Sequence, residues 1–237
     1  MSEPTFPPLM SGQAAGPGVD PFAKACAQAA LGSDSGVVVH RITPDILKAA
    51  IILAPEVPLD EAVVAIIACG LGFQNALGAL APPEVAVHLT WPGGIEVNGA
   101  ACGRLSIAAD LAPDPNWLVV GLQVPLLPAA EANPGDAPDQ TCLYEEGCAD
   151  VSPVQLLESW ARHSLHWLNR LQDGGTKALH TEWRGLAKDM GEAIDFELAG
   201  QRYEGTFMGV DENFGMLLRS GADTKLVPLT ALSEAAA

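Results

Sequence analysis

The sequence predicts an α+β fold followed by a small β-barrel at the carboxy-terminal end, and three observations support this prediction. First, 49% of the 237 residues are hydrophobic and 17% are charged, with 24 Gly and 19 Pro, which excludes a disordered chain and a coiled coil. Second, strand and helix patterns follow one another as far as Gly191. Third, from Glu192 the chain consists of short strands broken by turns, which is typical of a small antiparallel barrel. We therefore divide the chain into residues 1–191, of which 1–19 form an extended arm, and residues 192–237.

The first elements are indicated by capping signals and β-branched residues. Asp20-Pro21 is an N-cap followed by the favoured first-turn proline, so a helix is expected to run to about Ala30. A strand at residues 36–40, a short helix that starts at Thr43-Pro44 and a buried strand at residues 50–53 are expected to follow.

A long apolar helix is expected from Leu59 to the stop at Pro82-Pro83. Residues 62–81 are nearly uncharged and about long enough to span a bilayer. They include Gln74 and Asn75, and no basic residues flank them to set a membrane orientation. We therefore interpret the segment as a buried helix and expect no membrane partner.

The middle of the chain is predicted to form a set of strands. Residues 85–91 and 95–97 alternate between apolar and polar side chains, and Asn98-Gly99 is the strongest hairpin signal in the chain. The hairpin leads back into a strand at residues 102–109. Residues 117–126 are apolar on both faces, which predicts a central strand.

Two helices are expected after a loop at residues 128–150, which contains no Lys or Arg. Ser152-Pro153 again supplies an N-cap and a first-turn proline, and a broad apolar stripe continues to Leu171 before Gly174-Gly175 ends the helix. A second helix is expected at residues 176–190.

Charge and cysteine content limit the partners. The chain has 12 Lys and Arg against 29 Asp and Glu, a formal net charge of −17, which repels nucleic acid and anionic membranes. Five irregularly spaced cysteines and the absence of a basic, apolar leader indicate a cytoplasmic protein with free thiols. His163 and His166 share a helix face, but no Cys or carboxylate stands at ligand spacing, so no metal site is expected.

One hairpin resembles that of the biotin protein ligases. It reads Thr90-Trp-Pro-Gly-Gly-Ile-Glu-Val-Asn-Gly-Ala-Ala-Cys-Gly-Arg-Leu105, whereas the family has Lys-Trp-Pro-Asn-Asp, a short turn and then a Gly before an apolar strand. Residues 119–124, Val-Val-Gly-Leu-Gln-Val, are similar to the family's Val-Gly-Ile-Gly-Ile-Asn strand. Residues 205–218 are similar to its terminal barrel. The resemblance extends from about Asp20 to Leu232. The family in question comprises both the biotin and the lipoate protein ligases.

The resemblance implies a mixed, largely antiparallel sheet backed by helices, with a small Src-homology-3-like barrel at the end. It also implies a site for ATP and for biotin or lipoate. Members of the family activate the acid with ATP as an acyl adenylate and then transfer the acyl group to a lysine of a carrier protein. A homodimer formed through the sheet edge is known for the family. Such adenylation needs a fixed cation against the α-phosphate, where charge develops.

This chain departs from the family pattern at the charged positions. Thr90 stands at the position of the family lysine, and its hydroxyl can donate a hydrogen bond but cannot balance charge. Gly93-Gly94 replaces the family's Asn-Asp. The family's Gly-Arg-rich adenylate loop has no counterpart after His40-Arg41. We therefore expect a divergent member that has lost ordinary adenylation.

The candidate ligand-binding residues come from the strands that would form the floor of the pocket. His88 and Thr90 share a strand face, and Arg41 and Arg104 are candidates to replace the missing cation. For both arginines a solvent-exposed position is the alternative, and for His88 the alternative is a satisfied core histidine. The full set is His40, Arg41, His88, Thr90, Trp91, Gly93, Gly103 and Arg104.

Three functions remain open at this point. The first is a biotin- or lipoate-ligase homologue that keeps a pocket for a biotin-, lipoyl- or acyl-type ligand and acts as a binding module. The second is an active acyl, biotinyl or lipoyl transferase with an altered mechanism that takes an already activated donor. The third is an assembly protein that uses the scaffold as a surface and binds no ligand.

Overall fold

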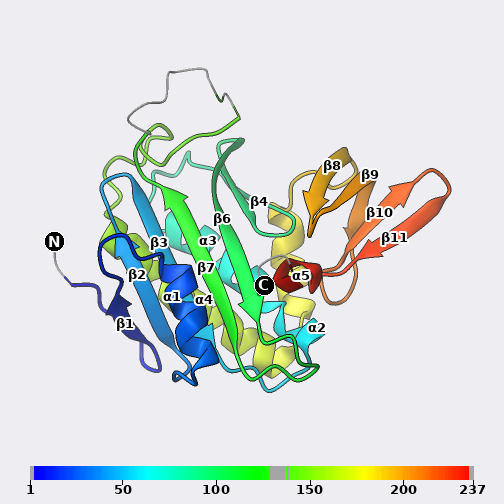
Figure 1. Cartoon of the computed structure of the whole chain (residues 1–237). Helices are drawn as coiled ribbons and strands as arrows, with labels where there is room; N and C mark the ends of the chain where they lie inside the picture. The colour runs from blue at the N-terminus through cyan, green and yellow to red at the C-terminus, as the bar shows by residue number, and fades with distance from the viewer. Residues whose placement is uncertain (1–2, 129–136, 138, 235–237) are drawn as a thin grey trace.

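The protein folds around a seven-stranded sheet, with a separate four-stranded sheet at its carboxy-terminal end (Figure 1). The computed structural model describes residues 3–128, 137 and 139–234. Strand order in the larger sheet is β1-β2-β3-β7-β6-β5-β4, and β1 pairs with β2 in parallel while the other pairs are antiparallel. The predicted α+β class is therefore confirmed, and β7 is central as expected.

The elements have the following bounds. The larger sheet comprises β1 Ser11–Ala14, β2 Val37–Ile42, β3 Ile46–Leu53, β4 Val87–Thr90, β5 Gly94–Val97, β6 Ala100–Ala109 and β7 Leu118–Pro125. The smaller sheet comprises β8 Ala193–Leu198, β9 Gln201–Val210, β10 Met216–Ser220 and β11 Asp223–Val227. The helices are α1 Pro21–Ala30, α2 Leu59–Ala62, α3 Ala65–Gly78, α4 Pro153–Gly174, α5 Lys177–Leu186 and α6 Ala231–Glu234.

The extended arm contributes the edge strand β1, and α1 starts where the capping signal predicts. The Asp20 carboxylate accepts a hydrogen bond from the Ala23 N–H at 3.1 Å. The expected short helix at Thr43 is wrong. The Thr43 N–H donates to the Ile46 carbonyl at 3.0 Å, so residues 43–45 form a turn between β2 and β3. Strand β3 also starts earlier than expected.

Helices α3 and α4 pack on one face of the large sheet and on each other (Figure 1). The Trp160 indole N–H donates to the Cys69 carbonyl at 3.1 Å, and that of Trp167 donates to Asn75 Oδ1 at 2.8 Å. The segment Leu59–Gly78 is long and apolar enough to cross a membrane by length and composition alone, and 78% of its most apolar window is buried inside the protein. It is broken at residues 63–64 and serves as the core of the helical layer.

Helix α1 covers part of the opposite face. Ala25 and Ala29 pack against Val39, Ala50 and other apolar side chains of β2, β3 and β7. A Cβ atom built at Gly121 would lie 2.5 Å from the Phe22 ring, so the glycine admits the aromatic ring. In Figure 1, α1 lies over the part of this face that is away from the turn between β2 and β3.

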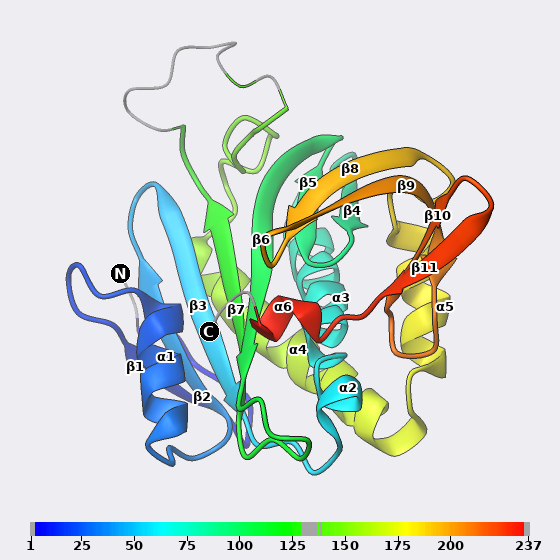
Figure 2. The same ribbon diagram turned by 45° about the vertical axis from the view of Figure 1, so that its right-hand side comes forward.

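The carboxy-terminal sheet packs on the main part through aromatic residues. The Trp91 indole N–H donates to the Phe214 carbonyl at 2.8 Å, and Phe214 stacks on His180 of α5 with ring centroids 4.0 Å apart. Figure 2 shows the chain then returning, so that α6 lies beside β6. The four antiparallel strands are consistent with a small Src-homology-3-like domain. The part of the expected loop at residues 129–136 and 138 lies outside the described residues.

Candidate functional site

Strand register brings four long polar side chains into one row across the large sheet. Arg41 of β2 is opposite Lys48 of β3, and Lys48 is opposite Gln123 of β7. Gln123 is in turn opposite Arg104 of β6. The row continues through Gly94 of β5 to Thr90 of β4. Lys48 and Gln123, which lie far apart in the sequence, thus become neighbours. We call Arg41, Lys48, Gln123 and Arg104 the cationic row.

The cationic row lies on the face that carries α1. Side chains alternate between faces along a strand. Leu47 and Ala49 of β3 belong to the core under α3 and α4, so Lys48 between them points the other way, as Ala50 does. The first turn of α1 lies next to this row, because Lys48 Nζ forms an ion pair with the Asp20 carboxylate at 3.0 Å.

Two of the three cations in the row lack a close partner among the described residues, although the hydrogen bond from the Thr43 hydroxyl and, to a smaller degree, the charge of Arg41 lower the pKa of Asp45 in the adjoining turn. Neither the Arg41 nor the Arg104 guanidinium forms a hydrogen bond or ion pair with the part of the chain that the structure describes. Arg104 is exposed and Arg41 is half-buried. Strands are spaced about 4.8 Å apart, so three strand steps put the Arg41 and Arg104 backbones roughly 14 Å apart.

Thr90 ends β4 at the other end of the row and carries no charge. A Cβ atom at Gly94 would lie 2.0 Å from Thr90 Oγ1, so the hydroxyl occupies the space that the glycine leaves. Lys188, which follows α5, runs beside β4, and its N–H donates to the Leu89 carbonyl at 3.0 Å. The Lys188 ammonium pairs with Glu96 of β5. The cation that comes near β4 is therefore already neutralised by a carboxylate.

The predicted histidines lie apart from each other. His88 is opposite Glu96 on the face of Thr90, and its Nδ1 atom is buried without a hydrogen-bond partner among the described residues. His40 lies on the opposite face from Arg41 because the two are consecutive in β2. Its ring contacts Phe6, with centroids 5.8 Å apart, and burial lowers its pKa below the ordinary value.

Trp91 and the two predicted glycines support the scaffold around the hairpin. Trp91 faces the carboxy-terminal sheet, with its ring edge-to-face on Phe196. A Cβ atom at Gly93 would lie 2.9 Å from the Leu105 carbonyl oxygen, and one at Gly103 would lie 2.6 Å from the Gln123 carbonyl oxygen. Both glycines thus allow close approach between backbones.

The turn between β2 and β3 leaves no phosphate loop at this edge of the sheet. Three residues, Thr43 to Asp45, connect the two strands, and none of them is a glycine or a basic residue. A loop that cradles phosphate needs several backbone N–H groups pointing at the ligand, usually supplied through glycines. The adjoining arginine, Arg41, therefore belongs to a strand and not to a loop.

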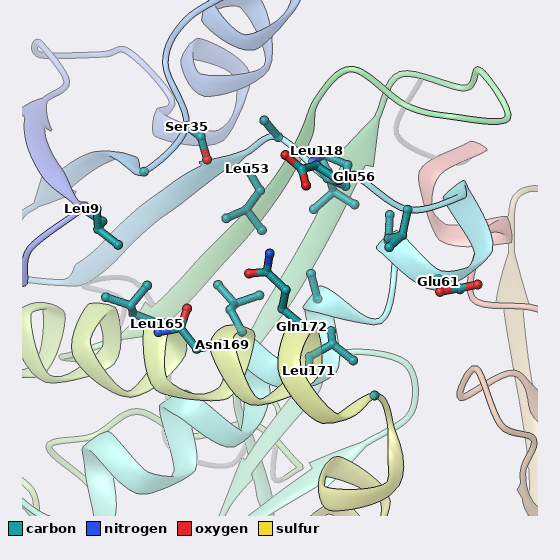
Figure 3. Close-up of a pocket in the computed structure, with 18 of the residues that line it drawn as sticks. Leu9, Ser35, Leu53, Glu56, Glu61, Leu118, Leu165, Asn169, Leu171 and Gln172 are labelled. Carbon is teal, nitrogen blue, oxygen red and sulfur yellow. The ribbon is translucent and has the colours of Figure 1, made fainter.

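A cavity of about 580 Å³ lies elsewhere in the fold (Figure 3). It is lined by Leu53 at the end of β3, Leu118 at the start of β7, and Leu165, Asn169 and Gln172 of α4. The pair Leu53 and Leu118 is five residues along the strands from Lys48 and Gln123, roughly 17 Å at 3.3 Å per residue. The cavity is also on the face that α3 and α4 cover, opposite the face of the cationic row, so the two are separate.

The cysteines add no reactive group. All five are free thiols, and burial raises the pKa of Cys69 and Cys102 to about 12. Such thiols stay protonated and are poor nucleophiles. Among the residues that the structure describes, no three His, Cys, Asp or Glu side chains are placed to hold a metal ion.

Lys48 and Gln123 are the members of the cationic row that sequence reasoning missed. Arg41 and Arg104 were singled out because they adjoin candidate pocket strands. Lys48 precedes the strand expected at residues 50–53, so the sequence did not place Lys48 on β3. Its register with β7 could therefore not be predicted either. The signal that could have found it is alternation, because Lys48 is two residues before the predicted strand at residue 50.

Two family models match the chain. The one described as "Biotin/lipoate A/B protein ligase family" matches residues 6–185, and the one described as "Domain of unknown function (DUF4444)" matches residues 190–235. A biotin--[acetyl-CoA-carboxylase] ligase of Paracoccus denitrificans is 27% identical over 162 residues, which are 67% of this chain and 67% of that protein.

Solved structures share the fold. A biotin protein ligase-like protein of unknown function from Silicibacter sp. TM1040 is 59% identical, with a TM-score of 0.89, and the match covers 97% of this chain and 99% of that one. The biotin protein ligase of Aquifex aeolicus is 17% identical, with a TM-score of 0.71, and the match covers 88% and 90% of the two chains.

Proposed function

Because the chain belongs to the biotin/lipoate A/B protein ligase family, we propose that it keeps a site for a biotin-, lipoyl- or other acyl-type ligand. We also propose that it has lost ordinary adenylation. The ligand site lies on the open part of the sheet face, between the first turn of α1 and Thr90. In this reading the protein is a binding module built on a ligase scaffold.

The observation that carries the proposal is the neutral end of the row at Thr90. Acyl adenylate formation places developing charge on the α-phosphate, which a fixed cation must balance in a dry site. Thr90 offers a hydroxyl, and the ammonium of Lys188, whose backbone runs beside β4, is paired with Glu96 and donates to the Gly99 carbonyl. Losing one such charged contact costs roughly 100- to 1000-fold in rate. The three-residue turn after Ile42 supports the same conclusion, because it leaves no room for a loop around the phosphates.

Partners and location follow from charge and thiols. A net charge of −17 slows the encounter with an acidic carrier domain through repulsion, so a small acyl-type ligand is the favoured partner over a carrier protein. Five free thiols are typical of the reducing cytoplasm, where we place the protein.

The test measures binding and activation separately. Calorimetric titration of biotin, lipoate and octanoate into the full chain is expected to show binding of at least one acid. ATP–pyrophosphate exchange with the same acids is expected to stay at background, while the Aquifex aeolicus ligase run in parallel with biotin shows exchange. Exchange by this chain at a comparable rate would overturn the proposal, and so would the absence of binding by every acid. Transfer from an acyl thioester donor would favour a transferase of altered mechanism.

A further inference from the structure

We propose that Arg41, Lys48 and Arg104 together hold the anionic end of the ligand, above the strand pair that carries Lys48 and Gln123. The inference rests on the proposed function, because it takes the ligand to lie on this face of the sheet. It adds which side chains bind the ligand's charge and what chemical class of ligand they select, namely a carboxylate or phosphate attached to an apolar body.

The first step is the distribution of charge. Residues 1–161 contain 18 acidic residues and four basic ones, Lys24, Arg41, Lys48 and Arg104. Three of these four lie in the cationic row, and Lys24 is in the first turn of α1, the turn that adjoins Lys48 through Asp20. The other five basic residues of the main part come after residue 161, in or just after α4 and α5, so the sheet and α1 hold their few cations mainly in this row.

The second step is the cost of that arrangement. Arg41 and Lys48 are directly opposite on neighbouring strands, and like charges in that position destabilise a strand pair. Asp20 balances Lys48 and Asp45 offsets part of the charge of Arg41, whereas neither arginine forms a close ion pair among the described residues. A bound anion removes the remaining repulsion, so the row is better satisfied with a ligand than without one.

The third step is reach. The Arg41 and Arg104 backbones are roughly 14 Å apart, one on each side of the β3 and β7 pair. An anion over Lys48 and Gln123 would be roughly 7 Å from each arginine backbone, a distance that a long arginine side chain can span. A guanidinium binds carboxylate or phosphate oxygens in pairs, and the ammonium of Lys48 adds a point charge between them.

The fourth step is what flanks the row. Ile46 and Pro125 are opposite each other, two residues further along β3 and β7 on the same face, and both are half-buried and apolar. On the other side, the Phe22 ring lies over Gly121. A charged group between two apolar patches is partly shielded from water, which strengthens its pairing with the row. The apolar patches also fit a ligand with a hydrocarbon body.

The experiment uses three probes that share one chain and differ in the head group: octanoate, octyl phosphate and the neutral octanamide. Each is titrated into the full chain by calorimetry, with the wild type and the variants Arg41→Gln, Arg104→Gln and Arg41→Lys. The control is Arg219→Gln, which removes an exposed arginine of β10, outside the row. Circular dichroism and the thermal midpoint verify that each variant is folded.

The expected result is that at least one anionic probe binds and that octanamide binds at least tenfold more weakly. A hydrogen bond to a charged group contributes about 1.5–3 kcal/mol, so each Arg→Gln variant is expected to weaken anion binding by roughly tenfold or more. Arg41→Lys keeps the charge and is expected to recover part of the loss, and Arg219→Gln is expected to bind as the wild type does. The stronger of the two anionic probes identifies the head group.

Two results would overturn the inference and leave the proposed function standing. One is anion binding that Arg41→Gln and Arg104→Gln leave unchanged, and the other is equal affinity for octanamide and octanoate. If none of the three probes binds, and biotin and lipoate do not bind either, the proposed function fails together with the inference.

Discussion

At the scale of single residues, Asp20 stabilises two structures at once. Its carboxylate caps α1 through the Ala23 N–H and pairs with Lys48 at 3.0 Å. Asp20→Ala removes both interactions and is expected to lower the free energy of unfolding by about 1–2 kcal/mol. Asp20→Asn keeps the cap and loses only the charge, which we expect to cost about 0–1 kcal/mol because the pair is partly exposed. Urea unfolding of the two variants measures the difference, and equal losses would contradict this division.

The same residue gives a pH dependence with a definite sign. Burial raises the pKa of Asp20, but the hydrogen bond from the Ala23 N–H and the charge of Lys48 together lower it by more. The pKa of Asp20 in the folded protein is therefore below its ordinary value. Such a group contributes stability that is complete above the unfolded pKa and is lost as the pH falls through the folded pKa. The stability gap between wild type and Asp20→Asn is therefore expected to be constant near neutral pH and to shrink below about pH 4.

Substitution by alanine is expected to have opposite effects on stability at two glycines. Gly103 has φ +147°, and a Cβ atom there would lie 2.6 Å from the Gln123 carbonyl oxygen on the neighbouring strand. Gly103→Ala is therefore expected to lower the free energy of unfolding by about 1–3 kcal/mol. Gly185 in α5 has open space around it and no unusual φ, so Gly185→Ala is expected to raise that free energy by roughly 0.5–1 kcal/mol. Thermal unfolding of both variants tests the pair, and a stable Gly103→Ala protein would contradict the close approach.

At the scale of elements, Trp91 joins the hairpin of β4 and β5 to the carboxy-terminal sheet. Its indole N–H donates to the buried Phe214 carbonyl at 2.8 Å. Trp91→Phe keeps most of the ring but leaves that carbonyl without its donor, which is expected to cost about 1–3 kcal/mol. Trp117→Phe is the matched control, because the Trp117 indole N–H has no partner among the described residues. Equal losses for the two variants, measured by urea unfolding, would show that the hydrogen bond contributes nothing.

Local signals predicted the elements where a helix start depends on its own cap. Asp20-Pro21 and Ser152-Pro153 were interpreted correctly, and in both the predicted side chain accepts a hydrogen bond from a first-turn N–H. Thr43-Pro44 has the same pattern and is wrong. There the Thr43 hydroxyl donates to Asp45 at 2.7 Å, and pairing between β2 and β3 turns the chain back. A long-range interaction thus overrides a local preference, which single-sequence reasoning cannot see.

The candidate site was predictable in its residue types but not in its arrangement. Motif resemblance indicated Thr90, and the position of Arg41 and Arg104 beside the candidate pocket strands indicated the two arginines. Lys48 and Gln123 enter only through the register of β3 with β7, which is set by contacts between distant segments. Whether His40 joins Arg41 could have been decided from alternation alone, since consecutive residues of a strand face opposite sides.

At the scale of the whole molecule, the two parts share one hydrophobic core. A single buried cluster includes Trp91 and Trp183 of the main part together with Phe207, Phe214 and Val227 of the carboxy-terminal sheet. The chain therefore passes from one sheet to the other near Gly191. That this position is also a domain boundary remains a prediction. No charge change marks it, since acidic residues outnumber basic ones on both sides.

A shared core predicts that both parts unfold together. Separation of the carboxy-terminal sheet would expose Trp91, Trp183 and Phe214 to water, at roughly 1.5–3 kcal/mol for each large apolar side chain. We therefore expect one thermal transition, with the calorimetric enthalpy equal to the van't Hoff enthalpy. Hydrogen exchange supplies a local probe, and the slowest amides of β9 and β10 are expected to report the same opening free energy as those of β3 and β7. Trp91→Phe should lower both values equally, because it weakens the contact on which the coupling depends. A lower opening free energy for β9 and β10 alone would mean that the sheet unfolds independently and that Gly191 marks a true domain boundary.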